Sequence, residues 1–203
     1  MRAPANWYLS ALQQVLKASW SPPDPAYRMR HIFEAYERRF PGALAVRRYI
    51  DGGAQPFDIV EDFRTAIMPE IGEPLPASRL NETMSAEAMA ILQDRRRTQF
   101  PNENGVFKSE TNALIARLLE QDKAVAGWRA PTLRPEIQGA ISACAVDAPW
   151  LKENYGIVFD GFDYGAVGAQ DVAGLEKARV EDICIVDQDR LRLLAASVAA
   201  GRV

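Results

Sequence analysis

Apolar side chains recur at intervals of three and four residues along most of this chain, as they do on one face of a helix. Residues 6–19 and residues 26–40 both follow this pattern, which predicts two amphipathic helices. The proline-rich run SPPDP at 21–25 separates them, because proline cannot continue a helix. The same reasoning predicts further helices over 58–67, 86–100, 109–125, 133–146 and 187–201, and a short helical turn over 150–155.

Polar residues mark where three of these helices should begin. Asp58 and Asp187 stand directly before apolar-periodic segments, and Ser85 precedes AEAMAIL. Short oxygen-bearing side chains at such positions accept hydrogen bonds from the first backbone N–H groups of a helix. We therefore expect Asp58, Ser85 and Asp187 to act as N-caps.

Two segments have the pattern of a strand. ALAVRRYI at 43–50 is β-branched and aromatic and lies between Pro-Gly and Gly-Gly pairs, which favours a strand. VEDICIV at 180–186 is consistent either with a strand or with an extended lead-in to the last helix. A lone strand cannot satisfy its own backbone groups, so partner strands must be present elsewhere in the chain or in another chain.

Charge is distributed unevenly. Residues 1–50 contain eight Lys and Arg against three Asp and Glu, whereas residues 51–203 contain sixteen against twenty-four. A basic N-terminal quarter on an acidic body favours a local anion site over a nucleic-acid coat, although a solvated helical face would give the same pattern.

The sequence gives little indication of a metal site, a disulfide bond or a membrane span. The cysteines, Cys144 and Cys184, are far apart, and His31 is the only histidine, which leaves no credible zinc set. No apolar run approaches the roughly 20 residues of a membrane span, and no apolar h-region of a signal peptide follows the first residues. We expect a reduced, cytoplasmic protein.

Arg2 and Ser10 are the best candidates for a binding site. They lie eight residues apart at the start of the first predicted helix, with Pro4 between them. A guanidinium and a hydroxyl in this arrangement can hold one phosphate, because arginine offers a fork of charged donors and a helix N-terminus adds unpaired N–H groups.

Other basic residues have more ordinary interpretations. His31 lies between arginines on a helix and is expected at the surface. Arg47 and Arg48 are expected to be salt-bridge partners. The run Arg95-Arg96-Arg97 near a helix C-terminus is explained by the helix dipole alone.

The pattern R-x-P-x-x-x-x-x-S at 2–10 resembles the 3′-phosphate-binding motif of sulfotransferases, which use 3′-phosphoadenosine 5′-phosphosulfate. The segments that follow are similar, in the same order, to the C-terminal half of bacterial sulfotransferase-like proteins: YLSALQQVLKAS (8–19), VRRY (46–49), DIVEDF (58–63), NETMSAEAMAIL (81–92) and PWLKENYGI (149–157). The resemblance covers most of residues 1–160 and implies that Arg2 and Ser10 bind the nucleotide.

The family's other nucleotide motif has no counterpart here. It is a Lys-containing, Gly/Ser/Thr-rich loop that stabilises the charge developing on the leaving 5′-phosphate, and this sequence contains no GxxxxGK[ST] run. The resemblance therefore implies that the chain corresponds to the C-terminal portion of such a protein and is inactive alone. The family reaction transfers a sulfuryl group to a hydroxyl, and analogy suggests a glycan hydroxyl.

The resemblance implies an α/β parent fold of the P-loop class, of which this chain supplies a mainly α-helical part with one or two strands. We expect residues 1–160 to form the sulfotransferase-like part, comprising the basic segment 1–50 and a helical region 51–160. Residues 161–203 should form an irregular segment and a C-terminal helix. The expected partners are a nucleotide co-substrate and either a second copy or a partner chain that completes the sheet. The alternative is a non-catalytic helical binding or scaffold protein.

Overall fold

The computed structural model describes residues 1–49, 58–74, 82–168 and 174–200. Within them the chain is mainly helical and contains no strand. The elements are α1 (Pro4–Val15), α2 (Arg30–Arg39), α3 (Ile59–Ile67), α4 (Ala86–Gln99), α5 (Ser109–Ala124), α6 (Pro135–Ala143), α7 (Ala148–Tyr155), the 3-10 turns η1 (Tyr164–Ala166) and η2 (Leu175–Lys177), α8 (Val180–Ile183) and α9 (Gln188–Ala200).

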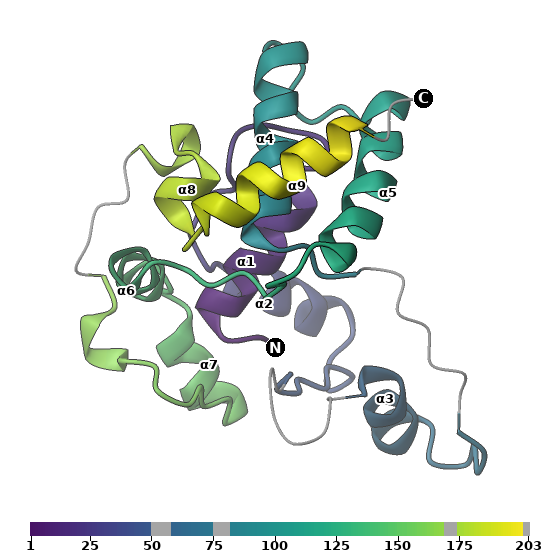
Figure 1. Cartoon of the computed structure of the whole chain (residues 1–203). Coiled ribbons are helices and arrows are strands. Elements are labelled where there is room, and N and C mark those ends of the chain that lie inside the picture. The colour runs from purple at the N-terminus through teal and green to yellow at the C-terminus, as the bar shows by residue number, and fades with distance from the viewer. Residues whose placement is uncertain (50–57, 75–81, 169–173, 201–203) are drawn as a thin grey trace.

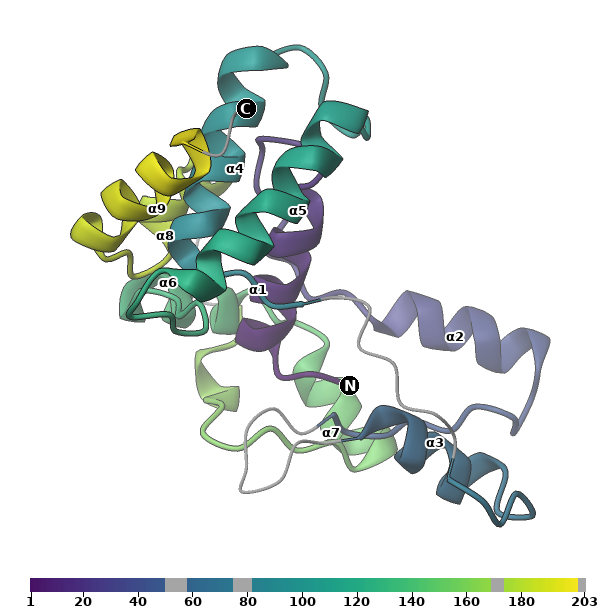
Figure 2. The same ribbon diagram turned by 45° about the vertical axis from the view of Figure 1, so that its right-hand side comes forward.

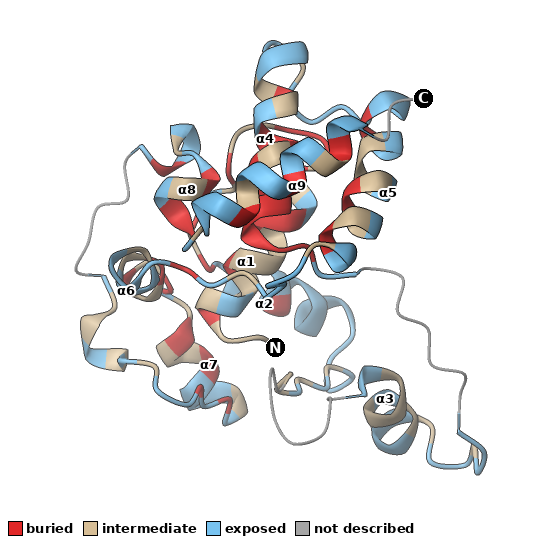
Figure 3. Ribbon diagram, in the orientation of Figure 1, coloured by how far each residue is buried: buried red, intermediate tan, exposed pale blue. Residues whose placement is uncertain are grey.

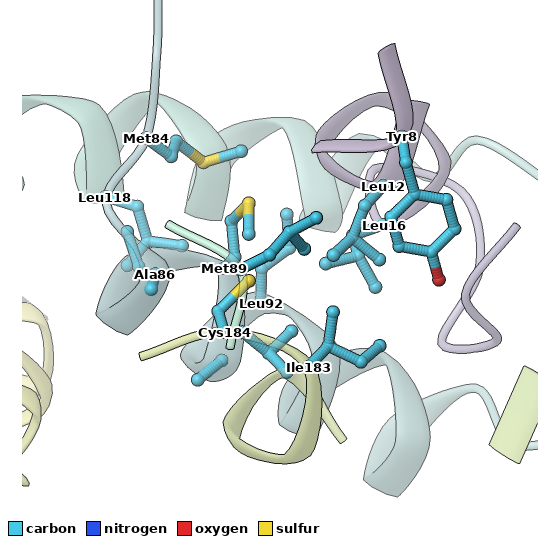
Figure 4. Close-up of a cluster of buried hydrophobic side chains, with 14 of the residues drawn as sticks. Tyr8, Leu12, Leu16, Met84, Ala86, Met89, Leu92, Leu118, Ile183 and Cys184 are labelled. Atoms are coloured by element: carbon cyan, nitrogen blue, oxygen red, sulfur yellow. The ribbon is translucent and has the colours of Figure 1, made fainter. Parts of the chain in front are cut away.

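Helix α4 is the centre of the larger core (Figure 1). It packs against α5, α8 and α9, and eight of its fourteen residues are buried. Leu92 is fully buried in this core and lies between side chains from the segments of α1 and α8 (Figure 4). Because apolar burial provides the main driving force for folding, this cluster fixes the position of α1 in the molecule.

A second, aromatic core holds α2 and α7 together. Phe33 of α2 packs against Trp150 and Tyr155 of α7, with ring centroids 6.0 and 5.5 Å apart. Tyr27 is fully buried and contacts Trp7 of α1 edge to face at 5.4 Å. Edge-to-face packing favours such pairs beyond simple burial, so Tyr27 connects this smaller core to the beginning of α1.

The expected N-caps are confirmed. Asp58 accepts hydrogen bonds from the backbone N–H groups of Val60 and Glu61 at 2.9 and 3.1 Å. Ser85 accepts one from Ala88 at 3.2 Å. Asp187 accepts two in the first turn of α9, and these backbone donors help to lower the pKa of its carboxyl group. Local sequence therefore determined where α3, α4 and α9 begin.

The strand expected at 43–50 is wrong for residues 43–49, which have no regular secondary structure; Ile50 lies outside the described residues. Tyr49 donates a backbone hydrogen bond to the Met1 carbonyl at 2.7 Å, and the Met1 nitrogen donates to the carbonyl of Arg47. The segment is thus extended beside Met1. Its one β-branched residue, Val46, suits that backbone, but no ladder forms among the described residues.

The segment 180–186 also differs from a strand. Residues Val180–Ile183 form α8, and Cys184 then forms an isolated antiparallel bridge with Leu133. Backbone hydrogen bonds of 2.9 Å flank the bridge on both sides. Extended backbone therefore occurs here only as a lead-in to α9, the second of the two interpretations that the sequence allowed.

Arg96 and Arg97 lie in the last turn of α4, where the sequence placed them, but Arg96 also has a structural role. It is fully buried, and its guanidinium donates to the carbonyls of Ala18, Glu103 and Val106. Burial lowers the pKa of the Arg96 guanidinium. Arg96 thus fastens the segments that follow α1 and α4 to the helical core, a role that the helix dipole does not explain.

Burial should make Cys184 chemically inert. Its thiol is fully buried, which raises its pKa to about 12. Because only the thiolate attacks alkylating agents, its reactive fraction at pH 8 should be roughly a thousandfold below that of an ordinary thiol. Iodoacetamide labelling followed by peptide mass spectrometry should modify half-buried Cys144 well before Cys184 in the folded protein, and both at similar rates in denaturant. Equal labelling in the folded state would contradict the burial of Cys184.

Among the described residues, none of the helices combines the length and the apolarity that crossing a bilayer requires.

Candidate functional site

Helix α1 presents two different faces. Tyr8, Leu12 and Leu16 follow one another at intervals of four residues and are fully buried in the larger core. Ser10 and Gln14 share the same interval on another face, because residues four apart lie one above the other on a helix. Burial of the apolar face therefore turns Ser10 toward the outside of the core.

Arg2 and Ser10 are in direct contact. The Nη1 atom of Arg2 donates a hydrogen bond to Ser10 Oγ at 2.8 Å, so the structure brings together the two residues that the sequence singled out. Both side chains are partly buried. The guanidinium has further N–H donors, and the Ser10 hydroxyl keeps its own donor hydrogen while it accepts from Arg2.

Aromatic residues hold Arg2 in position. Its backbone carbonyl accepts a hydrogen bond of 2.8 Å from the hydroxyl of buried Tyr27. Its guanidinium carbon lies 4.3 Å from the centroid of the Tyr49 ring, within the range of a cation–π interaction. Arg2 is thus held from two sides.

An open groove of about 480 Å³ lies beside this pair. It is lined by Arg2, Asn6, Leu9, Ser10, Gln13, Gln14, Thr83, Ala130 and Pro131. Among the described residues, this lining contains one cation, several amide and hydroxyl groups and no carboxylate. These donors can bind an anion. A carboxylate in the lining would repel the anion and compete for the arginine.

The first turn of α1 adds to this character. No side chain caps it: Ala3 occupies the N-cap position and Pro4 follows as the first helical residue. A helix N-terminus carries partial positive charge. The groove therefore combines a guanidinium, a hydroxyl and the positive end of a helix.

The other basic candidates are engaged elsewhere. Arg47 forms a bidentate ion pair with Asp62, with Nε 2.7 Å from the nearer oxygen, and its hydrogen bond is the main reason why the Asp62 carboxyl has a lowered pKa. Arg48 pairs with Asp160. Their expected role as salt-bridge partners is confirmed. His31 is exposed on α2, as expected.

Sequence reasoning missed a buried ionic cluster centred on Arg190. Its guanidinium is 3.0 Å from Glu87 and 2.8 Å from Asp122, and the three side chains are at most 4% exposed. Arg190 also donates to Ser85 Oγ at 2.9 Å and to the Asp122 carbonyl at 2.6 Å. The cluster joins the beginning of α4, the end of α5 and the beginning of α9.

The remaining polar atoms of the cluster are also hydrogen-bonded. Asp122 accepts from the backbone and the hydroxyl of Ser85 at 2.8 and 2.7 Å, and from Trp128 at 3.2 Å. Glu87 accepts from the Asp187 backbone at 2.8 Å. Buried charges persist only when they are paired and satisfied in this way. No spacing in the sequence could have revealed the cluster, because its members come from three helices far apart along the chain.

The part of the chain that the structure describes contains no group of three or more histidine, cysteine, aspartate or glutamate side chains placed to hold a metal ion. Comparison of the chain with protein-family models, with curated proteins and with solved structures gave no match.

Proposed function

We propose that this chain binds a phosphate-bearing nucleotide of the adenosine 3′,5′-bisphosphate class in the groove beside α1. The observation that carries the proposal is the 2.8 Å contact between Arg2 and Ser10 at the edge of a groove whose described lining residues include no carboxylate. A phosphate in this position would accept hydrogen bonds from the outer guanidinium nitrogens and from the Ser10 hydroxyl. The uncapped first turn of α1 would favour its negative charge.

The resemblance to sulfotransferases supports this assignment and suggests which phosphate is bound. By this resemblance Arg2 and Ser10 take the 3′-phosphate of 3′-phosphoadenosine 5′-phosphosulfate, the parent fold is an α/β sheet of the P-loop class, and the parent reaction is sulfuryl transfer to a hydroxyl in the cytoplasm. Donors to the leaving 5′-phosphate are essential for that step, and losing even one such donor can cost on the order of 10²–10³ in rate. The proposed role of this chain by itself is therefore nucleotide binding without sulfuryl transfer.

The test is a titration with adenosine 3′,5′-bisphosphate, followed by NMR and calorimetry. Two charge-assisted hydrogen bonds contribute roughly 1.5–3 kcal/mol each, and millimolar affinity requires about 4 kcal/mol. We expect millimolar binding that Arg2→Ala abolishes and Ser10→Ala weakens. Adenosine without phosphate should not bind.

Arg95→Ala is the matched control, because Arg95 lies on α4 and lines a different groove. The Arg95→Ala variant should bind adenosine 3′,5′-bisphosphate with the same affinity as the unmodified chain. Nucleotide binding that survives Arg2→Ala would place the ligand elsewhere and reject the assignment of Arg2 and Ser10. No binding at millimolar nucleotide would reject the proposal itself.

A non-catalytic helical binding or scaffold protein is the second candidate. It is favoured by the helical character of the chain, in which the described residues contain no strand, and by the exposed apolar side chains of α2 and α3. If nucleotide fails to bind, this function becomes the leading one.

A further inference from the structure

Helix α2 exposes an apolar stripe. Ile32, Tyr36 and Phe40 follow one another at intervals of four residues and are 40%, 56% and 56% exposed. Phe33 lies one turn before Tyr36, at the edge of this stripe, and is buried against α7, while the Arg30 backbone donates to Asp147 at 2.8 Å. The stripe therefore lies on a helix that is fixed in place with a large aromatic surface open to solvent.

Helix α3 exposes a second stripe with the same spacing. Ile59, Phe63 and Ile67 are 60%, 49% and 46% exposed, and no residue of α3 is buried (Figure 3). A helix of nine residues is too short to be stable alone in water. Packing of this stripe against another apolar surface would supply the stabilisation that α3 lacks.

The flanking charges of the two stripes are opposite. Residues 28–39 around α2 contain four arginines and two glutamates, whereas residues 58–73 around α3 contain five acidic residues and one arginine. Arg38 and Arg39 occupy the last turn of α2, and neither forms an ion pair with a described residue. The stripe of α2 is thus framed by positive charge and that of α3 by negative charge.

Both helices extend away from the cluster formed by α4, α5 and α9 (Figure 2). A two-fold axis beside them would place α2 of one copy against α3 of the other, and the same contact would occur a second time. Such an isologous arrangement uses every stripe once and closes on itself. It also pairs basic flanks with acidic ones, which a contact of α2 with α2 would not do.

We propose that the chain forms a homodimer in which the Ile32–Tyr36–Phe40 stripe of each copy packs against the Ile59–Phe63–Ile67 stripe of its partner. The interface is a bundle of four helices, two from each copy. It does not depend on a ligand at Arg2, so Arg2→Ala should leave the association unchanged, and failure of the nucleotide proposal would not affect it.

Sedimentation equilibrium of the full chain over a wide concentration range tests the dimer. The expected mass is twice the 22.5 kDa of one chain. Tyr36→Asp on α2 and Phe63→Asp on α3 should each give single chains whose circular dichroism loses at most the signal of the nine-residue helix α3, because both side chains are exposed and the two cores do not depend on them. Leu193→Asp is the control: this residue of α9 is 64% exposed but lies outside both stripes, and its substitution should leave the dimer intact.

A mixing experiment distinguishes the proposed pairing from others. A Tyr36→Asp chain retains its α3 stripe and a Phe63→Asp chain retains its α2 stripe, so a mixture can form one intact contact. The mixture should associate more strongly than either variant alone. Arg38→Glu combined with Arg39→Glu should weaken association of the parent chain by about tenfold, as expected when attractive interfacial charges are reversed.

Three results would overturn the proposal. The first is a single-chain mass at every concentration, including a single chain that instead binds vesicles of phosphatidylcholine and phosphatidylserine. The second is a dimer that survives both stripe substitutions. The third is a dimer that Tyr36→Asp abolishes and Phe63→Asp does not, which would indicate contact between the two α2 helices.

Discussion

Arg190→Met is expected to lower the free energy of unfolding by about 3–5 kcal/mol, because it leaves two buried carboxylates without their cation. Glu87 and Asp122 are each only 1% exposed, so water cannot replace the guanidinium without opening the core. Urea unfolding followed by circular dichroism would measure the loss. Arg190→Lys should also be destabilising, since an ammonium group has too few donors to reproduce the contacts that the guanidinium makes.

Arg192→Met is the matched control on the same helix. The Arg192 side chain is 77% exposed and pairs with Asp189 within one turn, and an exposed pair of this kind is worth less than about 1 kcal/mol. Equal stability of the Arg190→Met and Arg192→Met variants would show that the cluster is hydrated in solution and does not hold α4, α5 and α9 together.

Leu92→Ala should lower the free energy of unfolding by about 2–5 kcal/mol, the range seen when a buried leucine leaves a cavity in a packed core. Leu92 is fully buried on the central helix α4 and lies where α1, α8 and the Met89 side chain meet (Figure 4). Loss of its side chain should loosen α1, so resonances of Ser10 should shift as well. Thermal and urea unfolding together with NMR would measure both effects.

Leu193→Ala is the matched control for Leu92→Ala. It removes the same side chain from a position on α9 where the leucine is 64% exposed. Its effect should stay within about 0.5 kcal/mol, as for other surface substitutions. If both leucines cost the same, the larger core would not be centred on α4.

Local features of the sequence identified the helices well. Asp58, Ser85 and Asp187 were recognised as N-caps because a capping side chain acts on backbone groups two or three residues away, and the structure confirms all three. The contact of Arg2 with Ser10 was also open to prediction, since a helix beginning at Pro4 places Ser10 within reach of a residue just before that helix.

Errors arose where a residue's role depends on segments that are distant in sequence. Residues 43–49 have the composition of a strand, but a strand also requires a partner, and the described part of the chain provides only Met1 beside it. The place of Arg96 in the last turn of α4 agrees with the sequence, but its burial could not be foreseen, because it depends on carbonyls at 18, 103 and 106.

The sequence by itself determined the mainly helical character of this protein, the starting points of α3, α4 and α9, and the Arg2–Ser10 pair, because each depends on interactions within a few residues along the chain. Only the tertiary structure decided which arginines are buried, that Arg190 joins three helices through Glu87 and Asp122, and that the stripes of α2 and α3 face solvent. Helical spacing reveals that a face is apolar, but what covers that face depends on how distant helices pack.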